Sequence, residues 1–171
     1  MKIASVTSAE RGGIDQILSD VASRLQRQGV PLAGIVRDIG YASRFENGCD
    51  MKVRVLPDGP VIKITQDLGK GSAACRLDPG AIAEAVACVE HGALRGADLF
   101  IVNKFGPEEA AGRGFCGAIG AALEQDIPVL VGVGAANQAA FDRFSGGLAT
   151  ALAPDPEAIL AWFQGEVTSG L

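Results

Sequence analysis

The stretch LGKGSAACRLDPG, residues 68–80, gathers groups that bind anions just ahead of a predicted helix. Its glycines free the backbone so that successive N–H groups can face one anion. Its lysine and arginine add positive charge, and a guanidinium matches the oxygens of a tetrahedral oxyanion. The hydroxyl is a further donor, and the cysteine is a weak donor or a soft ligand. The predicted anion-binding residues here are Gly69, Lys70, Gly71, Ser72, Cys75 and Arg76, and the alternative is an ordinary loop.

A second candidate, TSAERGGID at residues 7–15, lies between an apolar run and a helical pattern, where a phosphate loop belongs. A working loop of the form GxxxxGK[ST] needs a lysine for the phosphates and a hydroxyl for magnesium. Ile14 and Asp15 follow Gly13 in place of those two residues, and an aspartate there repels phosphate. We interpret the segment as a degenerate phosphate loop whose remaining groups are Ser8, Arg11, Gly12 and Gly13.

A third group follows the most apolar run of the chain, in ADLFIVNKFGPEE. Asn103 and Lys104 stand where that strand should end, and Arg113 lies between two glycines a few residues later. An amide can bind a ligand but lacks the charge that holds magnesium. We expect Asn103, Lys104 and Arg113 to close the anion site; the alternative is a solvated lysine at a strand end. Glycines in such a segment indicate close approach of the backbone to another element or to a ligand.

The composition excludes several classes of protein. The chain has 171 residues, a length typical of one domain, and 48% of them are hydrophobic. Its net charge of −5, without a run of basic residues, argues against a nucleic-acid partner. No apolar run is long enough to cross a bilayer, and the first residues lack a signal-peptide core, so we expect a cytoplasmic protein. Four scattered cysteines and a single histidine predict no metal site.

The elements that must position these residues follow from periodicity. Apolar runs at residues 2–7, 32–38, 97–106 and 127–134 predict buried strands, with a short last strand within 147–153. Helical patterns begin at Ile14 and at Pro107, and others cover 79–94, 135–144 and 154–167. Alternation around PDGP within residues 51–67 predicts a β-hairpin inserted at a sheet edge. We therefore expect one α/β domain over 1–171: an open, mostly parallel, three-layer sheet of the P-loop or Rossmann-like kind, with helices on both faces.

In such sheets ligands bind at the carboxyl ends of the strands. Four loops should meet there, at residues 7–13, 66–76, 103–113 and 133–137.

TQDLGKGSAACRLDPGAIAEA, ADLFIVNKFGPEEAAGRGF and IPVLVGV together resemble a bacterial family of unknown function. The resemblance covers nearly the whole chain. It implies a P-loop-like fold, distant similarity to small nucleoside triphosphatases, and an association with molybdate transport and molybdenum enzymes. It therefore implies molybdate or tungstate as the ligand.

The first hypothesis is a binding protein that holds such an oxyanion for storage, sensing or delivery, without catalytic residues. The second is a nucleotide-binding enzyme in which Lys70 replaces the missing lysine and Glu108 or Glu109 organises magnesium. The third is a non-catalytic module that forms homo-oligomers. The absence of the loop lysine and of the magnesium-organising acid favours the first hypothesis over the second.

Overall fold

The computed structural model describes residues 2–43, 50–66, 76–92 and 94–169. In this part of the chain, seven strands form one sheet in the order β4-β3-β2-β5-β6-β1-β7. The strands are β1 (Ile3–Val6), β2 (Leu32–Arg37), β3 (Lys52–Val55), β4 (Val61–Lys63), β5 (Leu99–Phe105), β6 (Val129–Val133) and β7 (Thr150–Leu152). The helices are α1 (Gly13–Arg27), α2 (Pro79–His91), α3 (Pro107–Ala110), α4 (Cys116–Glu124), α5 (Gln138–Phe144) and α6 (Pro156–Ser169), with a 3₁₀ turn at Ala135–Asn137.

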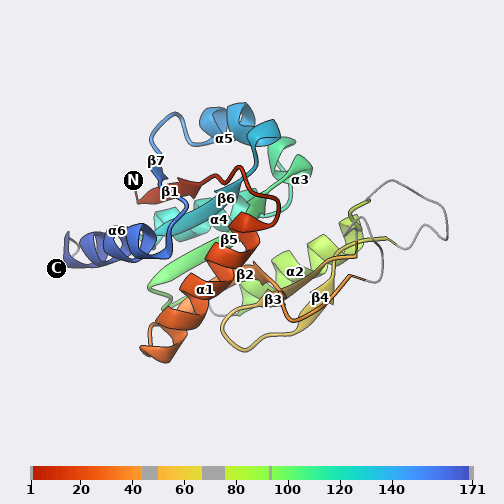
Figure 1. Ribbon diagram of the computed structural model, residues 1–171, viewed down its shortest axis with the longest axis horizontal. Coiled ribbons are helices and arrows are strands. Elements are labelled where there is room, and N and C mark those ends of the chain that lie inside the picture. The colour runs from red at the N-terminus through yellow and green to blue at the C-terminus, as the bar shows by residue number, and fades with distance from the viewer. Residues whose placement is uncertain (1, 44–49, 67–75, 93, 170–171) are drawn as a thin grey trace.

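The predicted α/β architecture is confirmed. Every pairing among β1, β2, β5, β6 and β7 is parallel. The expected hairpin is β3–β4, which pairs antiparallel with β2 and forms one edge of the sheet. The short strand expected within residues 147–153 is β7, which forms the other edge, and Figure 1 shows the two edges on opposite sides of the molecule.

Two cores cover the two faces of the sheet, because successive strand residues point to opposite sides. One core joins the sheet to α1 and α6 through residues such as Leu18, Val21 and Ile159. The other joins it to α2 and α4 through Ala85 and Ile119, among others. The sheet is therefore the middle of three layers.

The helix boundaries follow the capping residues. Asp78 accepts hydrogen bonds from the N–H groups of Gly80 and Ala81, as expected for the N-cap of α2. Gly29 ends α1 in the left-handed conformation, with a φ of 76°. Within the described residues, the structure shows no helix that is both long and apolar enough to span a membrane.

One helix differs from the prediction. The pattern that begins at Pro107 gives a single turn, α3, and the chain becomes helical again only at α4. Gly112 and Gly114 between them have φ values of 78° and 57°, which other residues rarely adopt, and these positions break the helix.

Candidate functional site

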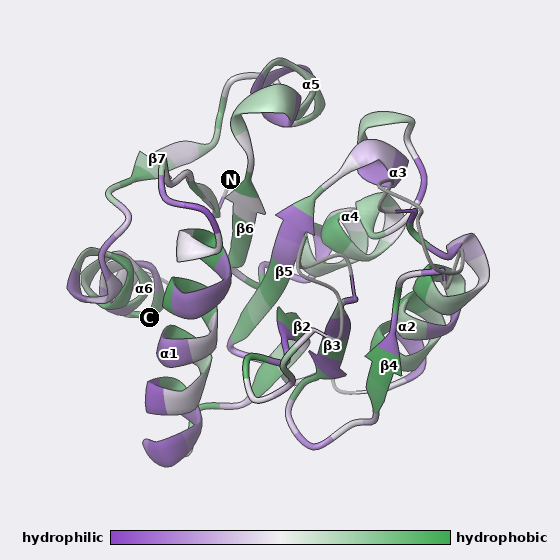
Figure 2. Ribbon diagram, turned by 45° about the vertical axis from the view of Figure 1, so that its right-hand side comes forward, coloured by the Kyte–Doolittle hydropathy of each residue, from purple (hydrophilic) through white to green (hydrophobic). Residues whose placement is uncertain are grey.

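A cavity of about 490 Å³ lies at the carboxyl edge of the sheet. It extends from the first turn of α1 across the ends of β2 and β5 to α2 and the hairpin. Figure 2 shows the change of character at this edge: the body of β5 is hydrophobic and its arrowhead is hydrophilic. We call one part of the cavity its polar end. This part consists of Arg11, Asp15, Arg37, Asn103 and Lys104.

The residues of the predicted degenerate phosphate loop divide into two groups: Ser8 and Gly13 form hydrogen bonds within the turn, and Arg11 and Gly12 line the cavity. Ser8 Oγ accepts a hydrogen bond from the N–H of Glu10, and the N–H of Gly13 donates to the Glu10 carbonyl, at 3.2 and 3.1 Å. These two amides therefore close the turn on itself and do not form an open cradle for a phosphate. Arg11 and Gly12, by contrast, line the cavity.

A network of three residues organises the polar end. One carboxylate oxygen of Asp15 accepts a hydrogen bond from the Arg37 guanidinium at 2.7 Å. The other accepts a hydrogen bond from the side-chain NH₂ group of Asn103 at 2.8 Å. The Asn103 carbonyl oxygen accepts from the backbone N–H of Arg37 at 2.9 Å. Asn103 is only 6% exposed, and this network satisfies both ends of its amide.

Sequence reasoning did not identify Arg37, because its partner Asp15 lies on another element 22 residues away. One feature of the sequence could have indicated Arg37: it is a charged residue at the end of the otherwise apolar run LAGIVR.

A register shift in β5 places Asn103 and Lys104 at the cavity. The pairing of β5 with β6 is irregular between Val102 and Phe105, as in a β-bulge, which changes the direction of side chains at a strand end. Gly132 on β6 permits this arrangement, because a β-carbon there would lie 2.1 Å from the Asn103 carbonyl oxygen. The predicted pair Asn103 and Lys104 is thus brought to the same cavity as Arg11 and Gly12.

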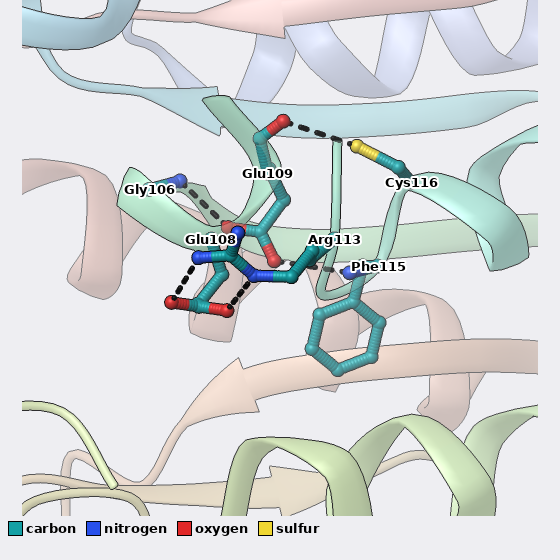
Figure 3. A network of polar contacts seen from close by, with 6 residues as sticks. All are labelled: Gly106, Glu108, Glu109, Arg113, Phe115 and Cys116. Carbon is teal, nitrogen blue, oxygen red and sulfur yellow. Dashed lines mark hydrogen bonds and ion pairs between the residues drawn. The ribbon is translucent and has the colours of Figure 1, made fainter. Parts of the chain in front are cut away.

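Arg113 lies elsewhere. Its guanidinium makes two hydrogen bonds to Glu108, at 2.9 and 3.1 Å, and its side chain is 63% exposed (Figure 3). Arg76 is also exposed, and neither arginine lines the cavity. The other predicted anion ligands, Gly69, Lys70, Gly71, Ser72 and Cys75, lie outside the described residues.

Glu109 is buried beside the cavity, where its carboxylate is a structural acceptor. One oxygen accepts from the N–H of Gly106 at 2.9 Å and the other from the N–H of Phe115 at 3.0 Å (Figure 3). A β-carbon at Gly114 would lie 2.0 Å from the second oxygen, so this glycine is required for close approach. The close approach that the glycines of this segment predict is therefore present at Gly114.

Cys116 should react slowly with alkylating agents. Burial raises the pKa of its thiol, and the negative charge of Glu109 adds to the effect. The thiol also donates to the Glu109 carbonyl oxygen at 3.2 Å. Since the thiolate is the reactive form, we expect iodoacetamide at pH 8 to modify native Cys116 at least several-fold more slowly than a cysteine in an unstructured peptide.

Peptide mapping by mass spectrometry isolates Cys116 from the other cysteines, and urea-unfolded protein is the control. The reaction rate of native Cys116 should rise at higher pH than that of the unfolded chain. Equal rates in the two states would contradict this prediction.

The comparisons with known proteins agree with this fold. The solution structure of a human cancer-related nucleoside triphosphatase superposes with a TM-score of 0.61 at 15% identity, covering 99% of this chain and 97% of that one. The crystal structure of THEP1 from the hyperthermophile Aquifex aeolicus gives 0.60 at 13% identity, covering 99% and 98%. The chain therefore shares the P-loop-like α/β fold of these two proteins.

The chain belongs to the family described as Protein of unknown function (DUF2478), whose model matches residues 3–162. It is also 35% identical over 164 residues to the molybdenum import ATP-binding protein ModC 2 of Bradyrhizobium diazoefficiens. That match covers 95% of this chain and only 18% of the length of the relative. The predicted resemblance to a family of unknown function is confirmed.

Magnesium, which P-loop nucleoside triphosphatases use with the phosphates, does not fit the residues present. The hydroxyl and acid that would hold the ion are replaced by Asp15 and Asn103, which bond to each other. The Arg37 guanidinium is already 2.7 Å from Asp15, so a fixed cation neutralises this carboxylate. The described residues also contain no group of three or more His, Cys, Asp or Glu side chains arranged to bind a metal ion.

Proposed function

We propose that this protein binds a tetrahedral oxyanion at the polar end of the cavity and does not hydrolyse a nucleotide there. The observation that carries the proposal is the Asp15–Arg37–Asn103 network, which fixes a guanidinium in the same cavity that Arg11 and Lys104 line. Arginine carries five N–H donors, and among the described residues the Arg37 side chain has Asp15 as its only hydrogen-bond partner. Donors therefore remain for an anion.

Molybdate and tungstate are the ions to test first. The relative that shares 35% identity is named for molybdenum import, and these ions are tetrahedral dianions that guanidinium and ammonium groups recognise. Storage, sensing and delivery are all compatible with such a site. We propose that Arg11, Arg37 and Lys104 contact the ion, that Asn103 holds Asp15 and Arg37 in place, and that Gly69, Lys70, Gly71, Ser72 and Cys75 also contribute to the site.

Nucleotide binding is the second candidate, and the likeness to two nucleoside triphosphatases favours it. The acids considered for magnesium do not support hydrolysis, however. Glu108 pairs with Arg113, and Glu109 already accepts two backbone N–H groups. Binding without hydrolysis remains compatible with these contacts.

Thermal-shift assays distinguish the two candidates, because a ligand that binds only the folded state raises apparent stability with its concentration. The first candidate predicts a shift with molybdate or tungstate in the absence of magnesium. A shift with ATP and magnesium, and none with any oxyanion, would reject it.

Two substitutions of the same ion pair should act in opposite directions. Asp15→Ala removes a carboxylate and releases Arg37, so oxyanion affinity should rise about tenfold; Arg37→Ala should lower it about tenfold. These sizes are expected for one charge acting over several ångströms in a partly exposed site. Isothermal titration at fixed ionic strength measures both.

Each variant controls for the other, because both break the contact between Asp15 and Arg37. A change in the same direction for both would show that the effect is structural and would contradict the proposed site.

A further inference from the structure

The cavity has an apolar wall that an inorganic ion leaves unused. This wall consists of Ile35, Val53, Ile64, Leu77, Ile82 and Ala85. These residues come from β2, from the hairpin with its flanks and from α2, and most belong to the core between α2 and the sheet. The polar end, by contrast, is built from the first turn of α1, from Arg11 two residues before that helix, and from the ends of β2 and β5.

The size of the cavity also exceeds that of a free oxyanion. A cavity of about 490 Å³ is in the range of sites for organic ligands. A tetrahedral oxyanion takes up only the space of a few water molecules, on the order of 100 Å³.

We infer that the ligand is an organic oxyanion, in which an apolar or aromatic body lies on the apolar wall and a phosphate group on the polar end. This inference rests on the proposed function and names its ligand class. The six wall side chains carry no hydrogen-bonding group, so they offer nothing to the hydroxyls of a ribose or to the edge of a purine. Among the described residues, this wall therefore matches an apolar ligand body better than a nucleoside.

Four probes test the inference by titration calorimetry in one buffer: phenyl phosphate, methyl phosphate, AMP and phenol. The two simple esters share the anionic group and differ in the apolar body. We expect phenyl phosphate to bind at least about tenfold more tightly than methyl phosphate, because its ring is removed from water at the wall. AMP should bind no more tightly than methyl phosphate, and phenol should bind more weakly than phenyl phosphate.

Ala85→Leu extends a side chain from α2 into the cavity, and Ala83→Leu adds the same atoms at an exposed position of the same helix. The first variant should abolish the preference for phenyl phosphate and leave the affinity for methyl phosphate within about twofold. The second should change neither. If Ala85→Leu does not fold, Leu77→Ser makes the wall polar and should also remove the preference.

The outcomes separate this inference from the proposed function. Equal affinity for the two esters would overturn the inference while the proposed oxyanion site stands, as would tighter binding of AMP than of phenyl phosphate. Failure of molybdate, tungstate and all phosphates to bind would overturn the proposed function. Phenol binding as tightly as phenyl phosphate would overturn the pairing of an apolar body with an anionic group.

Discussion

Replacing Glu109 with alanine should lower the free energy of unfolding by about 4 kcal/mol. Glu109 is 7% exposed, and its carboxylate accepts hydrogen bonds from the N–H groups of Gly106 and Phe115. Each donor left without a partner in a buried position costs about 1–3 kcal/mol, and bonds to a charged acceptor are the stronger ones. The loss should also loosen the turn that connects β5 to α4.

Urea denaturation measures this change, and Glu108→Ala is the matched control. Glu108 pairs with Arg113, whose side chain is 63% exposed, so its loss should cost no more than about 1 kcal/mol. Glu109→Gln should be intermediate, because its amide oxygen can accept from one N–H while its NH₂ group faces the other. A Glu109→Ala variant as stable as the Glu108→Ala variant would show that the two buried hydrogen bonds contribute little.

Replacing Gly132 with alanine should destabilise the protein by about 3 kcal/mol or more. The added β-carbon would lie 2.1 Å from the Asn103 carbonyl oxygen and 2.6 Å from a methyl carbon of Ile14. Overpacking of a core has costs of this size, and here one obstacle is backbone. Because β5 and α1 must both move, the contact of Asn103 with Asp15 should also be lost.

Chemical denaturation of Gly132→Ala and Gly165→Ala provides the comparison. Gly165 lies in α6, and a β-carbon there would have no atom within 4 Å, so that substitution should be neutral or stabilising by up to about 1 kcal/mol. Titration with the oxyanion that binds the wild type should show weaker binding by folded Gly132→Ala. An unchanged unfolding midpoint for Gly132→Ala would contradict the close packing of β5, β6 and α1.

The elements of the fold could be predicted because their signals are local. Apolar runs identified the parallel strands, Asp78 and Gly29 marked helix ends, and alternation about PDGP identified the hairpin. The break between α3 and α4 could not be located, since it depends on two glycines in left-handed conformations. The spacing of apolar residues in that segment does not predict the φ values of its glycines.

The site was only partly predictable. Arg11, Gly12, Asn103 and Lys104 meet at one cavity because the carboxyl ends of parallel strands share an edge. The contact between Asp15 and Arg37 depends on how α1 lies against the end of β2, which no short pattern encodes. Arg113 was predicted as an anion ligand because it lies between two glycines. In the fold its guanidinium instead pairs with Glu108.

The hairpin has a consequence for how related proteins can diverge. It is attached at one edge of the sheet, beside β2, and it supplies part of the apolar wall without supplying any charge to the polar end. Lengthening or exchanging this peripheral segment would reshape the space for the organic part of the proposed ligand and leave the proposed anion-binding residues on the central strands unchanged. Recognition of charge and choice of ligand body can thus evolve separately on one scaffold.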